Sequence, residues 1–132
     1  MAQIMISEPH DAVRRLLERM VTRLGHEAVV VRIPGPEHLA SAEVLLVEPA
    51  APVGAVLAQA ASIANPSLPI ICVSVTGPPP ELAQLGVVFA ASLVKPFTLE
   101  QLKDAVDQAL LARKAHQNAQ RPEGPLHENR AA

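Results

Sequence analysis

Hydrophobic positions along the chain follow two patterns that alternate. Short apolar runs of about four to eight residues, rich in Val, Ile and Leu, are typical of buried β-strands, whereas apolar residues spaced three and four apart indicate amphipathic helices. The predicted strands are residues 3–7, 27–33, 43–47, 68–75 and 90–95. The predicted helices are residues 11–25, 53–65 and 98–114, with shorter helices within 34–42 and 78–86.

The three longer helices carry apolar stripes that predict which side faces a core. In residues 11–25 the stripe lies opposite a run of charged residues, most of them arginine. In the last helix, Thr98 and Gln101 have the spacing of a capping box, which marks a helix start. In residues 53–65 the predicted apolar side consists of Val53, Val56, Leu57, Ala60, Ala61 and Ala64.

The order of elements is a strand followed by a helix, repeated five times. This alternation predicts an α/β fold in which a parallel sheet carries helices on both faces. In such folds, ligands bind beyond the carboxyl ends of the strands. The residues there are Glu8 and Pro9 after the first strand, Glu48 after the third, Ser74 after the fourth and Lys95 after the fifth. Because opposite charges favour each other's ionised forms, we expect Lys95 to contact Glu48 or Glu8.

Each of these residues also has a purely structural interpretation. The Ser74 hydroxyl can bond its own backbone at a strand end. Pro9 can begin the first helix, where its missing N–H costs nothing. Glu48 is either a fixed negative charge paired with Lys95 or the solvated end of a strand, and the residues alone leave both open.

Composition and charge exclude several classes of function. The net charge is −2 and aromatic residues make up 2% of the chain, so neither a phosphate-binding surface nor base-stacking platforms are predicted, and we expect no nucleic-acid partner. No apolar run approaches the ~18 residues of a membrane helix, and the N-terminal residues lack a signal-peptide pattern. With Cys72 as the single cysteine, inside an apolar run, we expect a buried thiol and a cytoplasmic protein that does not act at membranes.

The sequence also lacks common catalytic patterns. The histidines are scattered singly without ligand spacing, so no zinc site is predicted. There is no glycine-rich phosphate loop and no nucleophile-elbow motif, so we expect no enzyme activity.

Four motifs follow the predicted strands in turn. They are "ISEPHDAVRRLLERMVTRLGH", "LLVEPAAP", "LPIICVS", in which Ser74 follows the proline by five residues, and "LVKPF" before the last helix. With these motifs, residues 3 to 112 resemble the receiver domain of bacterial two-component response regulators. The resemblance implies a flavodoxin-like, doubly wound, five-stranded parallel sheet of order 2-1-3-4-5. It also implies that Lys95 contacts a phosphoryl group, that Glu48 holds the place of the phospho-accepting Asp, and that the peptide bond before Pro96 is cis.

Three positions depart from the family pattern. Glu48 is one methylene longer than the family's Asp, and a misplacement of about 1 Å costs ~100-fold in rate. The family's two magnesium-binding acids fall on Glu8 and Pro9, and proline has no side-chain oxygen, so magnesium has little support and we expect no cofactor. The switch aromatic three residues before the lysine is replaced by Ser92. The chain therefore resembles an atypical, or pseudo-, receiver.

These observations lead to one hypothesis and two rivals. We expect residues 1–114 to form a receiver-like domain, followed by a disordered tail over 115–132. We expect it to bind a partner protein or a second copy without phosphorylation, through the last helix, the fifth strand and the preceding helix. The rivals are a working phospho-receiver with a non-standard acceptor, and a small flavodoxin-like enzyme or nucleotide-binding protein.

Overall fold

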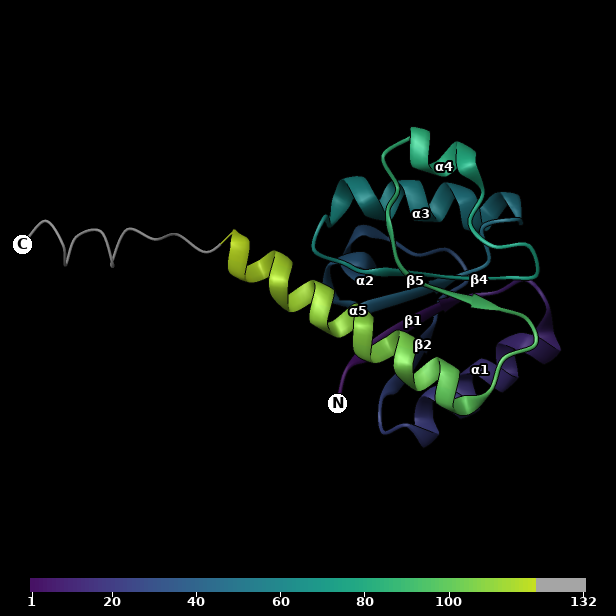
Figure 1. Cartoon of the computed structure of the whole chain (residues 1–132). Helices are drawn as coiled ribbons and strands as arrows, with labels where there is room; N and C mark the ends of the chain where they lie inside the picture. The colour runs from purple at the N-terminus through teal and green to yellow at the C-terminus, as the bar shows by residue number, and fades with distance from the viewer. Residues whose placement is uncertain (121–132) are drawn as a thin grey trace, which may run out of the picture.

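One all-parallel sheet organises the protein. The computed structural model describes residues 1–120, and its five strands lie in the order β2-β1-β3-β4-β5 (Figure 1). This confirms the predicted fold class and strand order. The strands are β1 (Gln3–Ser7), β2 (Glu27–Val30), β3 (Val44–Val47), β4 (Ile70–Ser74) and β5 (Phe89–Val94).

Helices cover both faces of the sheet. As Figure 1 shows, α1 and α5 lie on one face, and α2, α3 and α4 lie on the other. No helix among residues 1–120 combines the length and the apolar character needed to cross a bilayer. The helices are α1 (Asp11–Arg23), α2 (Pro36–Ser41), α3 (Pro52–Ala64), α4 (Pro80–Gln84) and α5 (Leu99–Ala119).

Side chains of the central strands pack into two hydrophobic cores, one on each face of the sheet. Val44 and Leu46 of β3 pack into the core under α1 and α5, whereas Leu45 and Val47 pack under α2, α3 and α4. Successive side chains of a strand point to opposite faces, so a strand with helices on both sides needs an unbroken apolar run. Burying each such side chain contributes about 1.5–3 kcal/mol.

The last helix begins as predicted and ends later. Thr98 accepts a hydrogen bond from the Gln101 amide at 3.1 Å, and the Gln101 side chain accepts one from the Thr98 amide at 2.8 Å. The helix then continues to Ala119, so residues 115–119, predicted as part of the tail, are helical. Once a helix has formed, each added residue gains a hydrogen bond. Between Thr98 and Pro122 the sequence has no proline that would break the helix. The rest of the predicted tail, 121–132, lies outside the described residues.

The predicted orientation of α3 is wrong for four of the six residues of its apolar stripe. The structure buries Gly54, Leu57, Ala58 and Ala61 against the sheet. Val53 and Val56, predicted to face the core, are each 68% exposed, and Ala60 and Ala64 are exposed as well. The helix has no charged residue that would mark a solvent side, so hydrophobic periodicity could not orient it.

The second strand is shorter than its apolar pattern indicates. It ends at Val30 rather than at residue 33, and Ile33 is 83% exposed. β2 is an edge strand that pairs only with β1, and this pairing ends with Val30 opposite Ile6. The other strand and helix boundaries differ from prediction by one or two residues.

Close packing between α3 and the loop after β3 predicts the effect of Gly54→Ala. In an open helix, alanine is more stable than glycine by about 1 kcal/mol. A Cβ on Gly54 would overlap the backbone oxygen of Glu48, so we expect this change instead to destabilise the protein by about 1–3 kcal/mol. Urea unfolding measures the difference, and Ala60→Gly on the exposed side of α3 measures helix propensity alone. A more stable Gly54→Ala protein would contradict the tight contact.

Candidate functional site

Three charged side chains meet beyond the carboxyl ends of the strands. Glu8 follows β1, Glu48 follows β3 and Lys95 follows β5. The Lys95 ammonium lies 2.7 Å from Oε1 of Glu8 and 2.9 Å from Oε1 of Glu48. Lys95 therefore makes both of the contacts that the sequence analysis offered as alternatives. Its backbone amide donates to the Ser74 carbonyl at 3.1 Å, which places the side chain across the end of β4.

The two glutamates are held in the same way, each within a Glu-Pro pair. Oε2 of Glu8 accepts a hydrogen bond from the His10 amide at 3.2 Å, and Oε2 of Glu48 accepts one from the Ala50 amide at 3.3 Å. In both loops the intervening residue is proline, which has no N–H, so the first downstream amide available is two residues on. Each carboxylate thus binds its own loop with one oxygen and faces Lys95 with the other.

The two contacts of Lys95 differ in geometry. The ammonium donates an aligned hydrogen bond to Glu48, whereas the contact with Glu8 is an ion pair whose Oε1 has no aligned donor. The side chain of Glu8 is also the more enclosed, with 1% of its surface exposed against 11% for Glu48. The cluster therefore combines one well-formed bond with one strongly buried charge.

The charges within this cluster depend on one another. Buried charges are unfavourable unless they are paired, and here one ammonium serves two carboxylates. Burial by itself lowers the pKa of Lys95, but the adjacent carboxylates of Glu8 and Glu48 outweigh it and raise that pKa above its ordinary value. Lys95 is therefore a cation throughout the physiological pH range.

The remaining predicted site residues do not join the ion cluster. Ser74 is buried and its hydroxyl accepts from the Thr76 amide at 3.2 Å, which is the structural role considered for it. Pro9 is exposed in the first loop, and Ser92 is exposed on β5. The Lys95–Pro96 peptide bond is cis, as the family resemblance implies.

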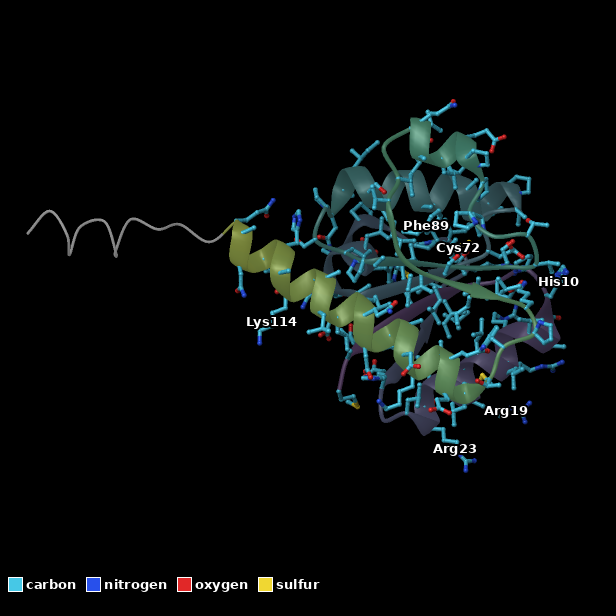
Figure 2. The ribbon with its side chains drawn as sticks, in the orientation of Figure 1. His10, Arg19, Arg23, Cys72, Phe89 and Lys114 are labelled. Carbon is cyan, nitrogen blue, oxygen red and sulfur yellow. The ribbon has the colours of Figure 1, made fainter. Side chains whose placement is uncertain are left out.

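The Cys72 thiol is buried as expected, and one histidine near the cluster does not take part in it. Cys72 is buried in β4, and burial raises the pKa of its thiol. His10 is exposed and points away from the body of the protein, so it adds nothing to the cluster (Figure 2).

The acidic residues do not fit a magnesium ion. Magnesium requires several oxygen ligands in near-octahedral geometry. Both carboxylates in the cluster face Lys95, and Pro9 supplies no oxygen. Among residues 1–120, no group of three or more His, Cys, Asp or Glu side chains could hold a metal ion.

Sequence reasoning missed a cleft beside the cluster and a groove on the far edge of the sheet. The cleft has a volume of about 490 Å³, and its lining includes Glu8, Pro9, Arg14, Arg32 and Gly54. Its arginines, Arg14 of α1 and Arg32 after β2, are far apart in the sequence. No sequence motif indicates that they line the same cleft.

The groove runs between β5 and α5 and has a volume of about 460 Å³. Ser92 lies in its lining, at the position where the family resemblance places an aromatic side chain. Val94, Gln101, Asp104 and Gln108 also contribute to it. The replacement of an aromatic by serine is a signal at this position, and the last helix and the fifth strand were also expected to form part of a partner surface.

Comparison with known proteins places the fold among receiver domains. No protein-family model matches the chain, and no curated protein matches it. Solved structures do match: the Vibrio cholerae chemotaxis protein CheY4 is 24% identical with a TM-score of 0.68, over 83% of this chain and 99% of that one.

Two other neighbours agree. A response regulator receiver domain protein from Clostridium thermocellum is 16% identical with a TM-score of 0.70, over 87% of this chain and 98% of that one. The signal receiver domain of a modulated diguanylate cyclase from Desulfovibrio desulfuricans G20 is 21% identical with a TM-score of 0.69, over 88% of this chain and 98% of that one. The fold is therefore the CheY-like receiver fold, and the chemistry must be argued from this chain's own residues.

Removal of the central cation tests the energetic role of the cluster. Lys95→Met leaves two buried carboxylates without their counter-ion, so we expect a loss of about 3–5 kcal/mol of unfolding free energy, measured in urea at neutral pH. Lys103→Met is the matched control: Lys103 pairs with Asp107 at 2.8 Å on the exposed side of α5, and the loss of such a surface pair should cost much less than the loss of Lys95. Equal, small losses in both variants would show that the cluster does not stabilise the fold.

Proposed function

We propose that this chain is a receiver-like signalling domain that acts by binding protein and does not use phosphorylation of Glu48. The observation that carries the proposal is the state of the Glu48 carboxylate. Its two oxygens are occupied by Lys95 and by the Ala50 amide, and the residue is 9% exposed. A carboxylate held in this way is a fixed charge rather than an available nucleophile.

The surroundings of Glu48 also argue against phosphoryl transfer. The reaction depends on in-line positioning and on neutralisation of the developing charge, usually by a metal ion. Any metal at this position would have to displace Lys95 from Glu8 and Glu48, and Pro9 offers it no ligand. We propose that the domain needs neither magnesium nor another cofactor and is not an enzyme.

The ion cluster supports a permanent signalling state. In the family that this chain resembles, the lysine contacts the phosphoryl group of the modified acceptor. Here Lys95 already reaches Glu48 at 2.9 Å, which is where that group would be. We infer that Glu48 holds Lys95 and the loop after β5 in one arrangement, so partner binding does not await a modification.

The partner surface that we propose is formed by α4, β5 and α5. The groove between β5 and α5 runs past Ser92 and ends at Lys95, so it adjoins the ion cluster. Val94 in its lining is 57% exposed, and Val88, which precedes β5, is 82% exposed. The occupant is a partner protein, or a second copy of the chain, in the cytoplasm; nothing in the composition favours a nucleic acid or a membrane.

The phosphorylation-independent function is tested by mass spectrometry with a small acyl-phosphate donor and magnesium. We expect the wild-type chain to gain no phosphoryl group. Pro9→Asp combined with Glu48→Asp supplies a second acid and a shorter acceptor, and we expect this variant to gain one group. A wild-type gain that disappears in Glu48→Gln would establish the rival, a working phospho-receiver.

The partner surface is tested by filling the groove. Ser92→Trp places a large ring in it, and we expect at least a tenfold loss of proteins retained from native extract by the immobilised chain. Thr22→Trp, at an exposed hydroxyl residue on α1, is the matched control and should retain them. Glu48→Gln should weaken the same interactions if the cluster orders the loop after β5. Undiminished retention by Ser92→Trp would place the partner elsewhere.

A further inference from the structure

The third helix is apolar on two opposite sides. Its inner side packs against the sheet, as described above. On its outer side Val53 and Val56 are 68% exposed, Ile63 is 76% exposed, and Ala60 lies exposed between them. Their spacing of three, four and three residues is that of the a and d positions of a coiled-coil heptad. We call these four residues the α3 seam.

The distribution of charge limits what can cover the α3 seam. The thirteen residues of α3 contain no charged side chain. From Ile33 to Val94 the sequence has no Lys or Arg at all, and the exposed charges of α2 and α4 are the acids Glu37 and Glu81. Anionic lipid headgroups and nucleic acids both require clustered cations, so neither fits this layer.

Basic side chains gather on the opposite layer. Arg15, Arg19 and Arg23 are exposed at four-residue intervals along α1, and Figure 2 shows Arg19 and Arg23 pointing away from the body there. The two faces of the sheet therefore differ in character, one basic and the other apolar and weakly acidic.

We propose that the α3 seam packs against the α3 seam of a second copy of this chain. In a two-fold symmetric interface each side chain near the axis lies close to its own symmetry mate, so any charge there would face a like charge. A helix without charges meets this requirement. A two-fold axis between the two helices, level with the middle of α3, makes them antiparallel, and the small Ala60 beside the centre allows close approach.

Packing against the sheet orders α3 before any second copy binds. Short isolated helices are marginal in water because nucleation is unfavourable, but α3 is already ordered by its inner side. Association therefore needs only the fixing of a few short, stiff side chains. With thirteen residues at ~1.5 Å each, α3 is about 20 Å long, so the interface is below the standard size and the dimer is weak and concentration-dependent.

This dimer differs from contact through the proposed partner surface. α3 lies in the middle of the layer on one face, whereas the groove lies between β5 and α5 at the sheet edge. Pairing through α3 leaves both grooves open, so the assembly offers two identical binding sites and can gain affinity by avidity toward a two-fold target.

Sedimentation of the full chain from about 10 µM to about 1 mM tests the proposal. The wild-type protein should shift from its 14.0 kDa monomer mass toward a dimer as concentration rises. Val56→Glu places like charges beside the axis and should weaken association at least tenfold. The matched control is Leu111→Glu, because Leu111 is also 68% exposed but lies on α5, in the opposite layer, and it should dimerise like the wild type.

Mixing Val56→Glu with Val56→Lys provides the sharper measurement. Neither variant should dimerise alone, and the mixture should form a heterodimer because opposite charges then meet near the axis. Thermal unfolding checks that both variants fold, as expected for a position that is largely exposed. Wild-type dimerisation should persist as sodium chloride is raised.

Four results would overturn the proposal: a wild-type monomer at the highest concentration, equal weakening by Leu111→Glu, no rescue in the mixture, or steep weakening by salt. The last would assign association to the arginines of α1 instead. Loss of dimerisation in Ser92→Trp with Val56→Glu unaffected would move the contact to the β5–α5 groove, so failure of this proposal is distinguishable from failure of the partner surface.

Discussion

The ion cluster of Glu8, Glu48 and Lys95 ties three loops of the protein to one another. The loops follow β1, β3 and β5, which are far apart in the sequence, and a single ammonium group connects them across the end of β4. Because buried charges are stable only when paired, each of the three side chains constrains the other two. This edge of the sheet therefore has one preferred arrangement, which also fixes the positions of the three loops.

A fixed edge has a direct consequence for how such a domain can signal. A switch needs two states of similar free energy and a chemical event that favours one of them. Here the acceptor position is already charged and already bound by the lysine. The repeated Glu-Pro pair explains how this is achieved, because each proline directs the carboxylate to the amide two residues on and leaves the other oxygen for Lys95. These contacts are the basis of the proposal that the domain keeps one state rather than exchanging between two.

The two helical layers differ in the residues that they expose. The layer of α1 and α5 carries the exposed basic residues, and the layer of α2, α3 and α4 is apolar and weakly acidic. Since α3 lies between two short helices and has an outer apolar seam, its layer is suited to contact with an uncharged surface. The groove beside β5 lies at the edge of the α1 and α5 layer, away from α3, so one small domain presents two different surfaces.

Most of the fold could be predicted from the sequence, and part of the site. Alternation of apolar runs and amphipathic segments identified the sheet, and the capping box at Thr98 and Gln101 located the start of α5. The sequence also predicted that Lys95 would contact Glu48 or Glu8, since parallel strands bring their carboxyl ends to one edge. In these cases the determining interactions are local or follow from strand direction alone.

Tertiary structure decided what periodicity could not. The orientation of α3 depended on which of two apolar sides the sheet covers, and a helix without charged residues carries no signal for that choice. The length of α5 depended on helix propagation through polar residues that composition assigned to a tail. The sharing of Lys95 between both glutamates arises from side chains far apart in the sequence, and the groove at Ser92 depends on how α5 packs beside β5. The sequence by itself determined the elements, their order and the charged groups at the sheet edge, because those follow from short-range patterns. Only the folded chain determined the contacts among those groups and the apolar seam left exposed, because both depend on packing in three dimensions.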